Sequence, residues 1–216
     1  MCCPRGLPIR TRERYTGRMK IIVIGATGTI GSAIVAALRG THEVIAASRK
    51  GAHKVDIKDA ASIAALLDKH RDADAVVCAA GDGVWKPFAE LTDADFAASL
   101  ANKLMGQVNV IRAALTRIRD NGSIVVTTGV LGHKPMPGGA ALSLLNGGLE
   151  AFVRAAALEA PRGIRVNVVS PPWVAETVEM MKLPPQPGAL PSATVAKSYV
   201  AAIEGTATGQ TIFPSA

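Results

Sequence analysis

The chain has 216 residues, 49% of them apolar and 4% aromatic, and its formal net charge is +7. This length and apolar content predict one compact domain with a substantial core rather than two domains. No apolar run approaches the roughly 20 residues that span a bilayer, so we expect a soluble protein with no membrane partner. The three cysteines, Cys2, Cys3 and Cys78, are too few for a disulfide scaffold and lack metal-ligand partners at usable spacing. They favour a reducing compartment, the cytoplasm, and no metal site.

Much of the positive charge lies in residues 1–18, which hold five arginines against one acidic residue and so carry a net charge of +4. This segment contains proline and glycine and has neither apolar periodicity nor a signal-peptide core. It predicts a disordered basic extension, followed by the domain at 19–216. A basic anchoring arm or transit-like segment is the alternative. We expect no nucleic-acid partner, because the rest of the chain has no basic stripe with interleaved aromatic residues.

From Met19 onward, short β-branched runs alternate with longer Ala/Leu-rich helical patterns, which is typical of βαβ units. We predict strands at 20–25, 43–47, 74–78, 122–128, 164–169 and 210–213. We predict helices at 29–40, 59–70, 92–119, 141–160 and 192–204. The fold class is α/β, a single-domain Rossmann fold whose doubly wound parallel sheet has helices on both faces. Its ligands are expected at the carboxyl edge of the sheet.

The first predicted strand leads into three glycines at three-residue spacing, in the sequence Gly25-Ala26-Thr27-Gly28-Thr29-Ile30-Gly31. Gly25 allows the chain to turn, Gly28 lets backbone N–H groups approach phosphates, and Gly31 lets the helix begin close to the strand. The pattern predicts a dinucleotide site, although an ordinary strand-to-helix turn can need glycine for its geometry alone. The residues that we expect at the cofactor here are Gly25, Thr27, Gly28, Thr29, Ile30 and Gly31.

The second predicted strand ends in Ser48-Arg49-Lys50, where a doubly wound fold meets the adenosine ribose. A carboxylate at this point would bind the free 2′-hydroxyl of NAD, whereas a hydroxyl and two cations suit the 2′-phosphate of NADP. We therefore predict NADP, with a solvated basic loop as the alternative. Asp56 could accept a hydrogen bond from the adenine amino group or serve as a turn aspartate.

Cys78-Ala79-Ala80-Gly81 closes the next strand with small residues that let a dinucleotide lie against the main chain. With the glycine turn and the segments at 122–126 and 163–171, it resembles the short-chain dehydrogenase/reductase family over residues 19–213. The turn spacing departs from the family's commonest Gly-x-x-x-Gly-x-Gly. The resemblance implies reversible hydride transfer between a nicotinamide and a carbonyl or alcohol. It places Ala79, Ala80, Gly81 and Pro171 beside the cofactor.

In that family a tyrosine acts as acid and base, and a lysine four residues on lowers its pKa. The resemblance maps these two positions to Leu142 and Asn146. Leucine has no proton to give and asparagine brings no charge. The family's serine maps to Gly129, or to Thr128 if the register slips by one residue, and Thr128 keeps a hydroxyl. General acid catalysis typically contributes about 10²–10⁴-fold, so this loss matters.

Three residues are candidates to supply the missing chemistry. Lys103, at the family's structural asparagine, could bring an ammonium near the nicotinamide ribose. His133 titrates near neutrality, and its loop is expected to face the substrate pocket. Thr128 could orient a carbonyl. Lys103 could equally be a solvated helix residue and His133 a surface residue, while Trp85 and Trp173 could wall an apolar pocket or cover the core.

The leading function is an NADP-dependent oxidoreductase with an atypical site that acts on a small carbonyl or alcohol. The alternative is a catalytically silent NADP(H)-binding sensor or interaction module. Helices 92–119 and 141–160, which are the family's dimer helices, each carry an apolar stripe. We therefore expect a homodimer or homotetramer.

Overall fold

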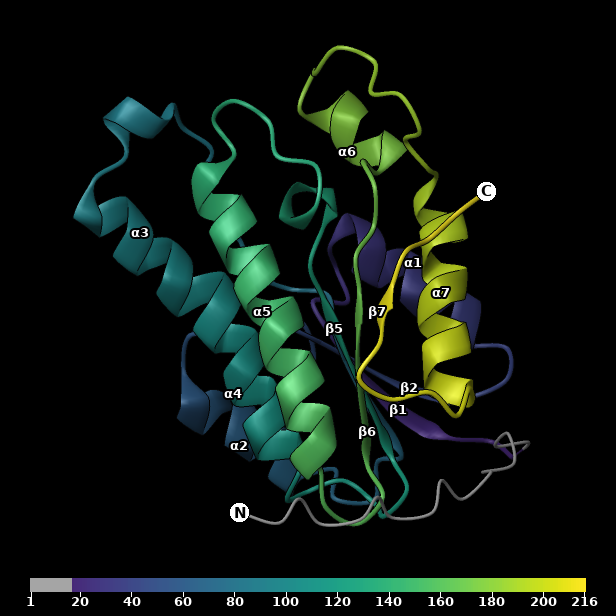
Figure 1. Ribbon diagram of the computed structural model, residues 1–216. Coiled ribbons are helices and arrows are strands. Elements are labelled where there is room, and N and C mark those ends of the chain that lie inside the picture. The colour runs from purple at the N-terminus through teal and green to yellow at the C-terminus, as the bar shows by residue number, and fades with distance from the viewer. Residues whose placement is uncertain (1–16) are drawn as a thin grey trace, which may run out of the picture.

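The computed structural model describes residues 17–216, so most of the predicted extension 1–18 lies outside the described residues. Seven parallel strands form one sheet in the order β3-β2-β1-β4-β5-β6-β7. Helices cover both faces of this sheet (Figure 1). The predicted α/β fold with a doubly wound parallel sheet is confirmed.

Six strands lie within one residue of their predicted ends, while the two-residue β3 was not predicted. The strands are β1 (Lys20–Ile24), β2 (Glu43–Ser48), β3 (His53–Lys54), β4 (Ala75–Cys78), β5 (Ser123–Thr127), β6 (Arg165–Val169) and β7 (Thr211–Ile212). The α-helices are α1 (Thr29–Leu38), α2 (Ala60–Asp68), α3 (Asp93–Ser99), α4 (Met105–Ala114), α5 (Ala140–Glu159), α6 (Ala175–Met180) and α7 (Ser192–Glu204). Two 3₁₀ turns, η1 (Phe88–Glu90) and η3 (Val130–Gly132), and a π-helical turn, η2 (Leu100–Leu104), complete the elements.

The prediction of one continuous α-helix at 92–119 was wrong. The π-helical turn η2 separates α3 from α4, and α4 ends at Ala114. A π-turn inserts one extra residue into a helix and rotates everything that follows, and such turns are frequent at functional sites. The short helix α6 was also not predicted.

The strands have nearly continuous apolar sequences because both faces of the sheet are covered. On β1, Ile22 and Ile24 join the core under α2, α4 and α5, whereas Ile21 and Val23 join the core under α1 and α7. Tyr199 on α7 is fully buried in the second core, and its hydroxyl lies 2.7 Å from the Thr127 hydroxyl. Burial raises the pKa of Tyr199, so this tyrosine is a core residue.

Helix α5 corrects the expectation that no apolar run approaches the length of a membrane span. Among residues 17–216 it is the one helix long and apolar enough to cross a bilayer by length and composition. Leu145, Leu149 and Val153 of α5 are fully buried, and the helix packs on β6. A helix that lies on a sheet in the core meets the same criteria, so its apolar character follows from its place in the fold.

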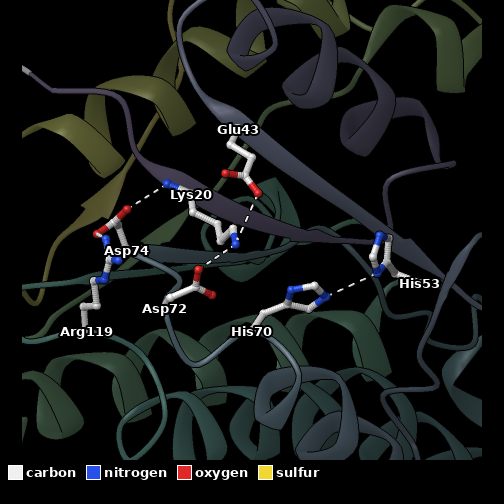
Figure 2. A network of polar contacts seen from close by, with 7 residues as sticks. All are labelled: Lys20, Glu43, His53, His70, Asp72, Asp74 and Arg119. Atoms are coloured by element: carbon white, nitrogen blue, oxygen red, sulfur yellow. Dashed lines mark hydrogen bonds and ion pairs between the residues drawn. The ribbon is translucent and has the colours of Figure 1, made fainter.

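A network of polar contacts holds the amino end of β1 (Figure 2). Lys20 Nζ lies 2.6 Å from Asp72 and 3.2 Å from Glu43, and the Lys20 backbone N–H donates to Asp74 at 2.7 Å. These contacts join the starts of β1 and β2 to the turn before β4. The network lies at the opposite end of β1 from the glycine turn, so it is structural in role.

Candidate active site

The glycine turn brings the start of α1 directly against the end of β1. Gly25 has a φ of +86°, and a Cβ there would lie 2.7 Å from the carbonyl oxygen of Ala79 on the neighbouring chain segment. A Cβ on Gly31 would lie 2.0 Å from the carbonyl oxygen of Gly25. No real side chain tolerates such distances, so these two glycines are required for the approach of helix and strand.

Gly28 is the N-cap of α1, and neither its backbone conformation nor the space around it requires a glycine. Its φ of −81° is open to any residue, and a Cβ there would contact nothing closer than 3.4 Å. No side chain caps this helix end. The bare backbone therefore leaves the first N–H groups of α1 and the positive end of its dipole accessible to an anion.

A cavity of about 480 Å³ lies in front of this turn, at the carboxyl ends of β1, β2 and β4. The predicted cofactor residues that line it are Gly25, Thr27, Gly28, Ser48, Arg49, Lys50, Asp56, Ala79, Ala80 and Gly81. Ile30 and Pro171 line a second cavity instead. Thr29 and Gly31 line neither cavity, and Gly31 is buried against the turn.

The far end of the first cavity is rich in cations. Arg49 and Lys50 lie there, as does Lys58, which sequence reasoning missed. None of the three forms an ion pair with another residue in the part of the chain that the structure describes. The Ser48 hydroxyl is buried and has no hydrogen-bond partner among residues 17–216. Asp56 lines the cavity and also accepts a hydrogen bond from the Lys58 backbone at 3.0 Å, so it is a turn aspartate as well.

The second cavity, of about 280 Å³, shares Gly81 and Asp82 with the first. Trp85 and Trp173 both line it, with their ring centroids 5.8 Å apart. Of the two interpretations of these tryptophans, the wall of a mostly apolar pocket is therefore confirmed.

Lys103 is brought to the second cavity by the π-helical turn η2. Gly81 has a φ of +124°, and a Cβ there would lie 3.0 Å from the Lys103 Cα, so the cavity wall is tight here. Burial lowers the pKa of Lys103, and the nearby Asp82 carboxylate partly opposes this effect. Lys103 has no hydrogen bond or ion pair among residues 17–216. Lys103 is therefore partly buried at the cavity wall rather than fully solvated on a helix surface.

Thr128 lines the second cavity directly after β5 and is 4% exposed. Gln107 fixes this point, because its side chain accepts from the Thr127 N–H at 2.8 Å and donates to the Thr127 carbonyl at 2.7 Å. The Thr128 hydroxyl donates to Glu150 Oε1 at 2.9 Å. Glu150 on α5 is only 2% exposed. Sequence reasoning missed it, although a carboxylate on the apolar face of a predicted helix is an unusual signal.

His133 does not line either cavity, which corrects the expectation that its loop presents the imidazole to the pocket. Its Nε2 lies 2.6 Å from Glu150 Oε2. The side chain is 41% exposed, and its ring lies edge-on to Phe213. His133 therefore contacts the site through Glu150.

Leu142 and Asn146, at the positions where the resemblance places tyrosine and lysine, both line the second cavity. Asn146 Nδ2 donates to the Gly129 carbonyl at 3.2 Å. Asn146 Oδ1 is buried and has no hydrogen-bond partner among the described residues. A buried acceptor without a partner at a cavity wall is suited to a ligand donor.

Residues 29–200 match the family model described as enoyl-(acyl carrier protein) reductase. The chain belongs to the short-chain dehydrogenase/reductase family. The solved structure of protein lin1944 from Listeria innocua is 36% identical, with a TM-score of 0.86 over 90% of this chain and 98% of that one. The resemblance inferred from the motifs is thereby confirmed.

A curated relative, the dTDP-4-keto-6-deoxy-D-glucose reductase of Streptomyces niveus, is 40% identical over 81 residues. This match covers 38% of the present chain and 26% of that protein, so the chain spans about a quarter of its length. The crystal structure of a small-chain dehydrogenase in complex with NADPH has a TM-score of 0.81 at 22% identity. It covers 92% of this chain and 97% of that one, and shows the same fold.

Substitution of Gly31 tests the helix approach. Gly31→Ala places a methyl group on the Gly25 carbonyl, so we expect the free energy of unfolding to fall by about 3 kcal/mol. Gly40→Ala is the matched control, since a Cβ there meets nothing within 4 Å. Denaturant titration of both variants measures the difference. Equal stability of the two would contradict the role assigned to Gly31.

Substitution of Lys103 tests whether a charge is buried at the site. Because the pKa of Lys103 is lowered in the folded state, its charge reduces the free energy of unfolding, and the full reduction applies below the folded-state pKa. The reduction disappears as the pH rises toward 10.5, the ordinary pKa of lysine. Lys103→Met should therefore raise the free energy of unfolding at neutral pH by about 1 kcal/mol. The gain should shrink at alkaline pH. Lys197→Met, at an exposed lysine on α7, is the control, and an equal effect in both would refute a buried charge.

Proposed function

We propose that this protein is an NADP-dependent short-chain oxidoreductase that transfers hydride between the cofactor and a small carbonyl or alcohol. The observation that carries the proposal is the pair of adjoining cavities. The first cavity has the glycine turn on one side and cations that form no ion pair among the described residues. The second cavity is mostly apolar, with a few polar groups at its wall. Such a division suits a dinucleotide that ends beside a substrate pocket.

The residues of the first cavity fit NADP. The N–H groups at the start of α1 suit the pyrophosphate, and the carbonyl-lined turn at Gly25 has no room for a side chain in its place. Ser48, Arg49 and Lys50 suit a 2′-phosphate, because the buried Ser48 hydroxyl has no partner and both cations lack ion pairs within the described residues. When bound, the nicotinamide supplies or accepts the hydride.

The second cavity is atypical in our proposal, since Leu142 and Asn146 stand at the positions of the family's tyrosine and lysine. Asn146 Oδ1 can accept a hydrogen bond from a ribose hydroxyl, and Lys103 brings a cation to the wall of the same cavity. Thr128 supplies the hydroxyl that contacts the substrate oxygen. With two tryptophans at the wall, a small apolar ketone or secondary alcohol fits best.

Cofactor preference is tested by Arg49→Asp. Removing the cation and adding a carboxylate should weaken NADPH binding by about tenfold or more and leave NADH binding little changed. Isothermal titration calorimetry measures both affinities. Arg39→Asp, at an exposed arginine outside the cavity, is the control. An unaltered NADPH/NADH ratio would remove the assignment of Arg49, and no heat with either dinucleotide would remove the proposal.

Turnover separates the oxidoreductase from a silent dinucleotide-binding module. The purified protein is titrated with NADPH and then assayed against small apolar ketones, aldehydes and quinones, with the matching alcohols in the reverse direction. Turnover of one substrate class supports the enzyme. Tight binding without turnover across the panel supports the silent module instead.

We further propose a homodimer or homotetramer formed through α4 and α5. Three large apolar side chains remain exposed on these helices: Met105 (43%), Leu144 (50%) and Leu158 (88%). We expect light scattering at micromolar concentration to give at least twice the mass of the chain, and Leu144→Asp to lower it. A monodisperse wild-type monomer would contradict this prediction.

A further inference from the structure

We infer that Thr128, Glu150 and His133 form a proton path that connects the second cavity to solvent. This inference rests on the proposed function and adds to it the route by which the proton of the reaction leaves or enters the site. Glu150 and His133 act through Thr128, so they are positioning and relay residues, whereas Thr128 contacts the substrate.

The path is continuous from the cavity wall to the surface. Thr128 lines the cavity and donates its hydroxyl hydrogen to Glu150 Oε1 at 2.9 Å. The other carboxylate oxygen, Oε2, lies 2.6 Å from His133 Nε2. The His133 side chain is 41% exposed, while that of Glu150 is 3% exposed. One hydrogen bond and one ion-pair contact therefore link a buried hydroxyl at the pocket to a solvent-accessible imidazole.

The direction of these bonds fixes what Thr128 can offer. An ionised carboxylate only accepts, so the Thr128 hydrogen is directed at Glu150. The lone pairs of Thr128 Oγ1 are then free to accept a hydrogen bond from a substrate hydroxyl. Removal of a proton from an alcohol requires a hydrogen-bond acceptor at the cavity wall with a carboxylate behind it. Thr128 and Glu150 provide this arrangement.

In alcohol oxidation the substrate O–H bond breaks and its proton passes to Thr128 Oγ1, while the Thr128 proton passes to Glu150. The carbinol C–H bond breaks with its electron pair, which leaves as hydride to oxidised NADP, and the C=O bond forms. Glu150 receives the Thr128 proton on Oε1, and His133, which keeps its Nε2 hydrogen toward Oε2, releases the proton of its other ring nitrogen to water. Ketone reduction runs the same steps in reverse, so protons and electrons balance in both directions.

Among residues 17–216, His133 is the titratable group in direct contact with the Glu150 carboxylate. The loop after η3 supplies His133, and β5 has no charged residue. Arg165 of β6 donates to the carbonyls of Ala202 and Ile203 under α7, on the other face of the sheet. Lys103 of η2 lines the same cavity as Thr128 without an ion pair to Glu150. One other charged residue of the elements around Glu150 is paired elsewhere, namely Asp95 with Lys86. The remaining charged residues of α5, of the elements packed against it and of this loop are exposed: Asp93, Arg112, Lys134, Arg154 and Glu159.

A buried carboxylate that is contacted on both oxygens could also serve only to hold the loop of η3 on α5. The two roles differ in what restores activity. A proton path responds to a replacement proton carrier, whereas a loop anchor does not. The test therefore includes chemical rescue as well as loss of function.

The kinetic test uses the wild type and variants with NADP and the best alcohol of the panel. Thr128→Val and His133→Ala should each lower kcat by about 10- to 100-fold, with NADP affinity and KM within about twofold. Thr128→Ser should restore kcat, and added imidazole should restore it in His133→Ala because the vacated position is open to solvent. Lys134→Ala, at an exposed neighbour of His133, is the control and should match the wild type.

The second readout needs no cofactor. In ¹H–¹⁵N spectra of the cofactor-free protein, the His133 Nε2–H, whose nitrogen lies 2.6 Å from a carboxylate oxygen, should give a strongly downfield, slowly exchanging signal. Glu150→Gln should move this signal upfield, since a neutral amide oxygen is a weaker acceptor. Lys134→Ala should leave it in place.

The downfield signal, the fall in kcat and its rescue by imidazole together support the path. Wild-type turnover with unchanged kcat in Thr128→Val and His133→Ala overturns the path but leaves the proposed function standing, as does a fall in kcat without rescue. A wild type that binds NADP and turns over no substrate overturns both. If Glu150→Gln does not fold, the Thr128 and His133 variants decide the question.

Discussion

The contact between Gly31 and the carbonyl of Gly25 is the constraint on which the site depends. At 2.0 Å from that oxygen there is no room for a Cβ, so α1 can begin against the end of β1 only with glycine at this position. The sheet order β3-β2-β1-β4 reverses direction between β1 and β4. The helix N-terminus is thereby held at the switch point of the sheet, where open α/β sheets bind ligands. The first cavity lies at this point.

The strands and most residues that line the first cavity could be predicted from sequence because their signals are local. A strand buried on both faces is an uninterrupted β-branched run, so its ends agree with the structure to one residue. The glycine spacing and Ser48-Arg49-Lys50 fall at strand ends, and the parallel sheet carries every such end to one edge. Gly31 was predicted to lie at the cofactor but does not line the cavity. Its role is to let α1 pack against the turn, which is also a local effect.

The second cavity could not be predicted to the same depth, because it depends on helix phase and loop direction. The apolar spacing on either side of Leu100–Leu104 does not indicate a π-helical turn. This turn nevertheless determines where Lys103 lies. The loop after β5 was expected to direct His133 to the pocket. In the structure, His133 lies beside Glu150 instead. Glu150 comes so close to this loop that a Cβ on Gly132 would lie 3.4 Å from its Oε1. Glu150 was the one signal in the sequence that could have indicated this, as a carboxylate on a core-facing helix surface.

The second cavity carries a cation at Lys103 and the Glu150 carboxylate behind the Thr128 hydroxyl, in a pocket that apolar side chains would otherwise fill. Burial disfavours the charge of Lys103, and well-packed apolar residues are often as stable as buried charged groups of similar volume, or more so. The bulk of Leu142 against Gly83, where a Cβ would lie 2.7 Å from Leu142, shows that this wall is otherwise built for apolar packing. A fold that keeps two separately placed charges in such surroundings does so at a cost in stability. Such a cost in stability is characteristic of functional sites, and it agrees with the proposal that this pocket serves hydride transfer.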